Sequence, residues 1–334
     1  SFPTRRSSDL GSKVVAVDLD LGNANMHTYF GIRYPRNTLI DFINGHVQDL
    51  NEILLDTSIY NLKFISGAGG ILGLANPGHT QKLKLIRYLE RLQVDHIVLD
   101  LGAGTAYNTI DFFLGATHHV IVTTPETPSV QSAYNFIRIC MFRSLYSTMA
   151  RTAATRDALE RAKIPTADGK VVGMRDLVAE LERTEPGSTD EFRAFQHSFA
   201  PFLVLNMVLK NEETRVGWGI REVVKRYLDV DVNFVGSISF DKVIRESVAN
   251  EVPYIINAPN ARPSGEFYSL TAKMMDGADH ESLREILHRE ARRTGKTYST
   301  RVIQSRTMAV DPSIYLADRI DDTWQMMYNS SYWR

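Results

Sequence analysis

Six short apolar runs recur along the chain, and each has the length of a strand. They are residues 13–17, 61–66, 96–101, 119–124, 202–208 and 232–238. The runs are continuous and rich in β-branched residues, which is typical of strands buried on both faces of a parallel sheet. Between them, helices are predicted over 129–142 and 213–228 and around Leu83, Ile86, Leu89 and Leu92. This alternation predicts an α/β fold with a doubly wound, mostly parallel sheet, whose ligands bind at the carboxyl ends of the strands.

Composition narrows the class of protein without assigning a function. The chain has 334 residues, 43% of them hydrophobic and 23% charged, so it can bury a sizeable core as one large α/β domain with additions. The formal net charge of -1 gives no overall attraction to nucleic acid or to an anionic membrane. The single cysteine, Cys140, excludes an internal disulfide and a multi-thiolate metal site. No apolar run approaches the roughly 18 residues that span a bilayer, so we expect a cytoplasmic protein.

The first ten residues, SFPTRRSSDL, match the translation of a common DNA-sequencing adapter. We therefore expect residues 1–10 to be non-native, and we expect the natural chain to begin upstream of Gly11. The alternative is a native polar segment without regular structure. A segment of adapter origin would take no part in the fold, so we expect the native domain to include residues from Gly11 onward.

Acidic residues follow two of the predicted strands. Asp18 and Asp20 end the first run, and Asp100 ends the run 96–101, where Gly102 and Gly104 follow. Carboxylates at the mouths of neighbouring strands suit a hydrated Mg²⁺ and an attacking water, and glycines let backbone N–H groups approach phosphate oxygens. A single aspartate at a strand end is more often a turn former or a helix cap. Two such ends in one α/β chain favour a nucleotide site.

Five segments together resemble one family. DLDLGNAN (18–25) is similar to the switch I segment of the MinD/ParA family of P-loop ATPases, and LDLGAG (99–104) resembles its Walker B and switch II segments. VIVTTPETPSVQSAYNFI (120–137) and VLNMVLKNEE (204–213) resemble the strands and the helix that follow in that family. NLKFISGAGGILGLANP (61–77) narrows the likeness to the flagellar-number regulators of the FlhG/FleN branch. The resemblance covers roughly residues 11 to 275.

The resemblance implies an ATPase that uses ATP and Mg²⁺ as a switch for homodimer formation, with hydrolysis often stimulated by a partner protein. It would control the placement or number of a cellular structure, either the flagellum or the division or partition machinery. Asp20 would position the attacking water, and Asp18 and Asp100 would hold Mg²⁺ mostly through water. The nucleotide-binding residues that it implies are Gly22, Asn25, Gly102, Gly104, Asn206 and Asp241. Ser239 stands where the family usually has a proline two residues before Asp241.

The family's phosphate loop is absent from the printed sequence. A KGGxGK[ST] pattern should precede Lys13 by one helix, and nothing there matches it. The glycines Gly67, Gly69, Gly70 and Gly73 have no Gly-Lys-Ser/Thr, so they are interpreted as a loop of the parent fold. We expect the polypeptide as printed neither to hydrolyse ATP nor to bind it tightly. Loss of a first strand should also lower its stability, because neighbouring strand edges become exposed.

The expected organisation is a nucleotide-binding domain over 11–276, a helical insertion within it over 144–200, and a helical tail over 277–334. The insertion is predicted to face a partner or to act as a lid, with a solvated decoration as the alternative. In the tail, the basic stretch 281–296 either contacts DNA or anionic lipid, peripherally to the membrane, or is a solvated face. The end, 321–334, is interpreted as a docking segment or a cut end.

Two functional hypotheses other than control of the flagellum remain open. A DNA-partition ATPase of the same family draws its support from the basic tail stretch alone. A nonhydrolysing binding or scaffold module, without any phosphate loop, predicts a native start codon near Gly11.

Overall fold

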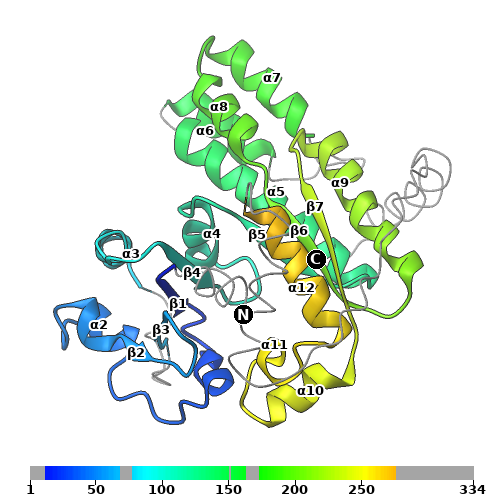
Figure 1. The fold of residues 1–334 in the computed structure, drawn as a ribbon. Coiled ribbons are helices and arrows are strands. Elements are labelled where there is room, and N and C mark those ends of the chain that lie inside the picture. The colour runs from blue at the N-terminus through cyan, green and yellow to red at the C-terminus, as the bar shows by residue number, and fades with distance from the viewer. Residues whose placement is uncertain (1–11, 68–76, 150–151, 163–172, 276–334) are drawn as a thin grey trace. The chain divides into compact units, whose positions relative to one another are not determined.

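The computed structural model describes residues 12–67, 77–149, 152–162 and 173–275, which are coloured in Figure 1. These residues form two compact units. The first holds the described residues up to Gly115 and from Ile238 on, and the second holds Ala116–Ser237. The segment 1–10, the glycines Gly69, Gly70 and Gly73, and the predicted tail 277–334 lie outside the described residues.

The sheet of the first unit has four strands in the order β2-β3-β1-β4. The strands β1 (Val14–Asp18), β3 (Leu62–Ile65) and β4 (His96–Asp100) are parallel, as predicted from their apolar runs. The two-residue strand β2 (Leu55–Asp56) pairs with β3 in the antiparallel direction and was not predicted. Every residue of β1 is buried, which explains its uninterrupted apolar sequence.

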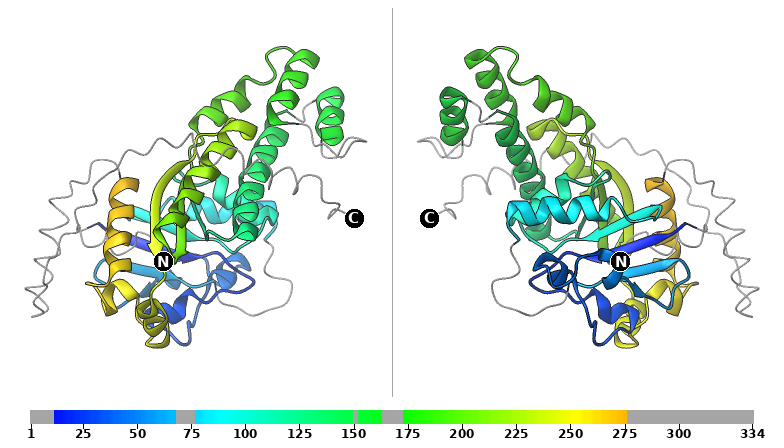
Figure 2. Two further views of the ribbon diagram at one scale, coloured as in Figure 1. Left: turned by 90° about the vertical axis from the view of Figure 1, so that its right-hand side faces the viewer. Right: turned by 90° about the vertical axis from the view of Figure 1, so that its left-hand side faces the viewer.

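Side chains of β1 alternate between two apolar clusters, one on each face of this sheet. Val15 and Val17 pack in a cluster with Leu85 of α3 (His79–Leu89) and Phe112 of α4 (Tyr107–Leu114). The opposite cluster contains Val14 and Ala16 together with side chains from β3 and from the short helix η1 (Met26–Phe30). The helix α12 (Arg262–Met274) lies on the other side of the strands from α3 and α4 (Figure 2). Strands covered on both faces confirm the doubly wound architecture.

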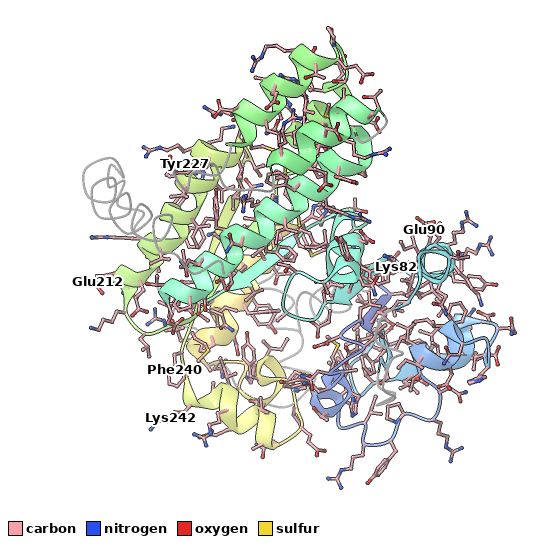
Figure 3. All side chains as sticks on the ribbon, turned by 180° about the vertical axis from the view of Figure 1, so that it is seen from behind. Lys82, Glu90, Glu212, Tyr227, Phe240 and Lys242 are labelled. Carbon is pink, nitrogen blue, oxygen red and sulfur yellow. The ribbon has the colours of Figure 1, made fainter. Side chains whose placement is uncertain are left out.

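The helix predicted around Leu83, Ile86, Leu89 and Leu92 is present as α3. Leu85 is completely buried, whereas Leu83 is 40% exposed and the helix ends before Leu92. The helix is held to α4 by an ion pair between Lys82, labelled in Figure 3, and Asp111. The remaining helical segments of this unit are α2 (Leu39–Ile43), η2 (Leu50–Ile53), α10 (Lys242–Ala249) and α11 (Tyr254–Asn257).

The second unit contains a three-stranded sheet in the order β5-β6-β7. Its strands are β5 (Val120–Thr123), β6 (Phe202–Val208) and β7 (Asn233–Ser239), and β5 runs parallel to β6. The long helix α5 (Thr127–Met149) and the helix α9 (Arg215–Leu228), preceded by η3 (Asn211–Thr214), occupy the two predicted helical segments. The fold class is therefore confirmed as α/β with mostly parallel strands.

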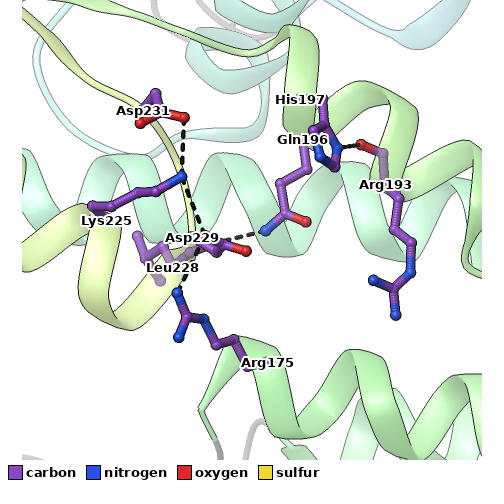
Figure 4. A network of polar contacts seen from close by, with 8 residues as sticks. All are labelled: Arg175, Arg193, Gln196, His197, Lys225, Leu228, Asp229 and Asp231. Atoms are coloured by element: carbon purple, nitrogen blue, oxygen red, sulfur yellow. Dashed lines mark hydrogen bonds and ion pairs between the residues drawn. The ribbon is translucent and has the colours of Figure 1, made fainter.

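Three further helices lie within 144–200: α6 (Ala153–Ala162), α7 (Met174–Thr184) and α8 (Asp190–Ser198). Charged and polar side chains link α7 and α8 to the carboxyl end of α9 (Figure 4). Arg175 contacts Asp229 at 3.2 Å, and Gln196 donates to the carbonyl oxygen of Leu228 at 2.9 Å. Exposed ion pairs of this kind contribute little, about 0–1 kcal/mol, so buried apolar residues such as Leu181 supply most of the stability.

None of the helices in the described part of the chain is long and apolar enough to cross a membrane.

Candidate functional site

The carboxyl ends of β1 and β4 bring two of the predicted acidic residues side by side. Asp18 and Asp100 are paired in the parallel register of these strands. Directly after this pair, the backbone N–H of Leu19 donates to the carbonyl oxygen of Asp100 at 2.8 Å. The β1–β4 pairing therefore places both carboxyl groups where the carboxyl ends of these two strands meet.

Asp18 is the most buried of these acids, with 1% of its surface exposed. Its Oδ1 accepts the backbone N–H of Asp20 at 3.2 Å, and its Oδ2 accepts that of Met26 at 3.0 Å. Burial is the main reason that the pKa of Asp18 is raised to about 6, and the nearby Asp100 and Asp20 carboxylates also raise it. The two N–H donors lower the pKa but do not outweigh burial. Asp18 thus lies at the centre of the site and organises the chain that follows β1.

Asp20 lies against the loop that follows β4. A Cβ atom added to Gly102 would be only 2.7 Å from Oδ1 and 2.8 Å from Cγ of Asp20. Glycine at position 102 therefore makes room for the Asp20 carboxylate. Gly104, two residues later, has a φ of +102°, a conformation that residues with a side chain rarely adopt. This glycine loop leads directly into α4.

The three carboxyl groups concentrate negative charge. Asp100 reaches the surface, yet burial of its carboxyl by neighbouring protein raises its pKa, and the Asp20 carboxylate raises it further. Among the described residues, no lysine or arginine forms an ion pair with Asp18, Asp20 or Asp100. A hard divalent cation with oxygen ligands fits this donor set.

The described residues do not form a site that coordinates a metal ion directly through several side chains. The described residues contain no group of three or more histidine, cysteine, aspartate or glutamate side chains arranged to hold a metal ion. Mg²⁺ usually keeps several of its water ligands and takes only one or two carboxylates from the protein. Asp18 and Asp100 fit a hydrated Mg²⁺ of this kind.

The segment that carries Gly22 and Asn25 runs from Asp20 to η1. Gly22 is exposed in a turn closed by the N–H of Asn23, which donates to the carbonyl oxygen of Asp20 at 2.9 Å. The carbonyl oxygen of Asn25 accepts the hydroxyl of Thr28 at 2.8 Å. Because the next residue, Met26, donates its N–H to Asp18, this segment is tied directly to the acidic cluster.

Gly67 is a residue of the site that sequence reasoning set aside. A Cβ atom there would lie 2.3 Å from the carbonyl oxygen of Asp18 and 3.3 Å from Cβ of Ala24. Gly67 is buried just after β3, so it lets that chain pass close to the end of β1. Its place two residues beyond a buried apolar run is a signal that a close backbone approach was needed.

Two predicted residues lie apart from the acidic cluster in the chain. Asn206, in β6 of the second unit, accepts the backbone N–H of Met207 on its Oδ1 at 2.9 Å, and Met207 has a φ of 58°. Asp241, in the first unit, caps the amino end of α10, where its Oδ1 accepts the N–H of Val243 at 3.0 Å. The preceding residue, Phe240, is 52% exposed and is labelled in Figure 3.

Ser239, in place of the family's usual proline, has a definite structural role. Its backbone N–H and its hydroxyl both donate to the carboxylate of Glu266 in α12, at 2.6 and 2.7 Å. The same carboxylate accepts Nε of Arg262 at 2.8 Å. A proline has no N–H, so only a residue such as serine can make both bonds. This contact fixes the end of β7 on α12.

The chain is similar in sequence to an antiactivator and to a flagellum site-determining protein. Antiactivator FleN of Pseudomonas aeruginosa is 23% identical over 271 residues, which cover 80% of this chain and 77% of FleN. Flagellum site-determining protein YlxH of Helicobacter pylori is 29% identical over 140 residues, 39% of this chain and 44% of YlxH. No family model matches the chain.

The fold is similar to that of a solved structure. The septum site-determining protein MinD from Pyrococcus horikoshii, complexed with Mg-ADP, matches with a TM-score of 0.52 and 18% identity. This match covers 82% of the chain and 88% of that protein.

Proposed function

We propose that the chain is a member of the MinD/ParA family of P-loop ATPases and that its parent protein is an ATP-dependent switch controlling flagellar number or position. The observation that carries this proposal is the convergence of Asp18, Asp20 and Asp100 where β1 and β4 end. Support for the flagellar role comes from the names of FleN and YlxH, an antiactivator and a flagellum site-determining protein.

In the proposed mechanism, Asp20 orients the water that attacks the γ-phosphate. Asp18 and Asp100 hold a hydrated Mg²⁺, which neutralises charge on the phosphates when it is bound. A positive charge beside Asp18 would favour its ionised form and oppose the effect of burial. Phosphoryl transfer needs positioned charges more than covalent chemistry, so the buried Asp18, the half-buried Asp20 and the glycine loop can supply one side of the proposed site, and the phosphate loop has to supply the other.

The segments around the acids form the proposed switch. Gly22 and Asn25 respond to the phosphate through the chain between Asp20 and Met26, because both ends of that chain are bonded to Asp18. Gly102 and Gly104 supply backbone N–H groups on the β4 side. A change in the charge of Asp18 would therefore act directly on η1, whose first residue, Met26, donates its N–H to Asp18.

From the family resemblance, Asn206 and Asp241 are proposed as nucleotide-binding residues, and each is described within its own unit. The Oδ1 of Asn206 is held by the N–H of Met207, which leaves its amide N–H donors available for a base. Asp241 is held as the cap of α10, so its backbone is fixed for contact. Family resemblance supports these two roles.

We also propose that the phosphate loop and its strand belong to sequence upstream of Gly11, and that residues 1–10 are non-native. Among the described strands β4 pairs only with β1, and its apolar residues Ile97, Val98 and Leu99 are half-buried. An apolar strand with one unpaired edge supports a missing neighbour. In this proposal the polypeptide as printed does not hydrolyse ATP, residues 11–276 form the nucleotide-binding domain, and 277–334 form a tail.

The proposed switch works as an ATP-dependent homodimer that a partner protein stimulates. The solved structures with a similar fold include a complex of MinC with MinD from Aquifex aeolicus, which supports a protein partner. The insertion 144–200 is proposed as a surface for such a partner.

The test begins with long-read sequencing across the 5′ end of the gene. An in-frame strand and KGGxGK[ST] loop upstream of Gly11 would give the parent protein, whose ATP hydrolysis is then measured with Mg²⁺. Asp20→Asn should lower kcat by at least about 100-fold, on the scale of losing a positioned catalytic group, while ATP binding persists. The matched control is Asp56→Asn, a highly exposed acid paired with Lys63, which should leave kcat unchanged.

A start codon beside Gly11, or an extended protein that hydrolyses ATP equally well with Asp20→Asn, would refute the catalytic proposal. The first of these outcomes would favour a binding module without a phosphate loop.

A further inference from the structure

An exposed loop of the first unit displays two arginines around a tyrosine. Residues 33–37, RYPRN, are named here the Arg-Tyr loop, and they contain no acidic side chain. Tyr34 is 89% exposed, the side chain of Arg33 is 73% exposed, and Arg36 is also exposed. Within the described residues Tyr34 has no hydrogen-bond or ring partner. Tyrosine and arginine are the residues that most often dominate binding at protein interfaces.

Both ends of the Arg-Tyr loop are fixed. On one side, Ile32 donates its N–H to the carbonyl oxygen of His27 at 3.0 Å and packs against a buried cluster. On the other side, the N–H and hydroxyl of Thr38 both bond Oδ2 of Asp41, at 2.8 and 2.9 Å. Leu39 then donates its N–H to Ser66 at 2.8 Å. A loop held at both ends keeps its backbone in place, so a ligand has to order the side chains but not the chain path.

The charge of the loop is largely uncompensated. Arg33 has a loose contact of 3.6 Å with Glu251, and both side chains are solvated. Arg36 forms no ion pair with a described residue. An acidic segment with apolar residues would therefore find two cations and one aromatic ring on the same short loop.

The tail of the chain contains a segment of this chemistry. Residues 311–322, DPSIYLADRIDD, carry Asp311, Asp318, Asp321 and Asp322 against a single arginine, Arg319. The apolar residues of this segment are Ile314, Tyr315, Leu316 and Ile320. Four acids interleaved with apolar side chains complement the arginines and the tyrosine of the Arg-Tyr loop.

We propose that residues 311–322 dock on the Arg-Tyr loop of the same chain. The described chain ends at Met275, directly after α12, in the unit that also contains the loop. Between Met275 and Asp311 there are 35 residues, and a random coil of that length has an end-to-end distance of roughly 30–35 Å, which is enough to cross one face of a small domain. Docking would cover a surface that follows η1, so an acidic partner protein would have to displace the tail.

The test uses the full chain and a fluorescein-labelled peptide of residues 309–324. The receptor carries Asp311→Asn, Asp318→Asn, Asp321→Asn and Asp322→Asn, so that its own tail no longer competes. Fluorescence anisotropy should show binding that weakens with added salt, because exposed charge pairs are screened. Arg33→Ala with Arg36→Ala should weaken it at least about fivefold, and Tyr34→Ala several-fold, in line with the loss of two exposed pairs or one aromatic anchor.

Two controls separate this site from general attraction. Arg87→Ala with Arg245→Ala removes two exposed arginines from α3 and α10 and should leave peptide binding unchanged. Tyr34→Phe keeps the ring and should bind within about twofold of the unmodified receptor, since the hydroxyl is exposed to water. Circular dichroism of each variant confirms that it is folded.

Occupancy by the chain's own tail is tested with the unaltered tail. The labelled peptide should bind at least about fivefold more weakly to that protein, by the same amount at every protein concentration, because an intramolecular competitor does not dilute. Competition that grows with protein concentration would assign the segment to a second copy and overturn the proposal. The proposal would also be overturned if the peptide did not bind, or if the Arg87/Arg245 control lost as much peptide affinity as the Arg33/Arg36 variant. The same holds if oligo-dT bound as tightly as the peptide and independently of Tyr34.

Discussion

Two glycines at the site should respond very differently to the same added methyl group. In Gly67→Ala the new Cβ would lie 2.3 Å from the carbonyl oxygen of Asp18, about 1.1 Å closer than ordinary contact. That oxygen belongs to the buried strand β1, so the backbone itself has to move. Overpacking of this kind costs about 1–3 kcal/mol, and the entropy gain of replacing glycine returns about 0.4–1 kcal/mol. We expect Gly67→Ala to lower the free energy of unfolding by about 1–2 kcal/mol.

Gly102→Ala meets the end of a side chain instead. The new Cβ would lie 2.7 Å from Oδ1 of Asp20, and a shift of about 0.7 Å by that carboxylate relieves the contact. Since Asp20 can rotate, we expect the free energy of unfolding to change by less than about 0.5 kcal/mol. Under the proposed catalytic role of Asp20, the displaced carboxylate should lower kcat of the parent protein about 10–100-fold, because misplacement of a catalytic group by about 1 Å can cost about 100-fold.

Hydrogen exchange measured by mass spectrometry at increasing urea gives the assay, since it follows β1 itself. Trp218 is the only tryptophan among the described residues and lies in the second unit, so its fluorescence would not report on β1. Wild-type protection of β1 in Gly67→Ala, or a greater loss of protection in Gly102→Ala than in Gly67→Ala, would refute the reasoning from the two contacts.

Three further changes test other parts of the structure. Burial raises the pKa of Asp18 in the folded state to about 6, above the ordinary value of 3.8, so between these values the folded state binds a proton that the unfolded state has lost. The free energy of unfolding should therefore fall by up to about 3 kcal/mol as the pH rises from 4 to 6 and then level off. Urea unfolding across this range should show that slope, and an unchanged slope in Asp18→Asn would contradict it. Ser239→Pro removes both hydrogen bonds to Glu266 and should lower the free energy of unfolding by about 2–3 kcal/mol. Ser239→Ala keeps the N–H and should lower it by about 1 kcal/mol. Equal shifts of the thermal unfolding midpoint for the two variants would contradict the role of the N–H bond. Arg175→Ala should cost under about 1 kcal/mol and Leu181→Ala about 2–5 kcal/mol, and the reverse order in thermal unfolding would mean that charge holds the insertion.

The strands were predictable because most of their side chains are excluded from water on both faces. Each of the six apolar runs matches a strand of the structure to within one residue at either end, and β2 alone among the described strands was not predicted. The strand β2 has only two residues, Leu55 and Asp56, which is too short for any periodicity. The helix α3 was also predictable from its spacing, whereas the exposure of Leu83 depends on how the helix is oriented against the sheet.

The sequence by itself determined the α/β class, the order of the strands along the chain, and the candidate acids at two strand ends. These follow from local patterns, because each strand and its terminal aspartate are contiguous. Only the tertiary structure decided that Asp18 and Asp100 share one register position, that Asp18 is buried, and that its pKa rises to about 6. Desolvation depends on how the chain packs around Asp18, whose register partner Asp100 lies far away in the sequence.

The same distinction holds for the glycines and for Ser239. Sequence showed glycine at 67 and 102, whereas the contacts of 2.3 and 2.7 Å that require them arise between separate segments of the chain. Ser239 read as a departure from the family pattern, and its partner Glu266 lies in a helix 27 residues away. Local sequence specifies which groups are present, while packing between distant segments decides which of them meet and what that contact does to charge and stability.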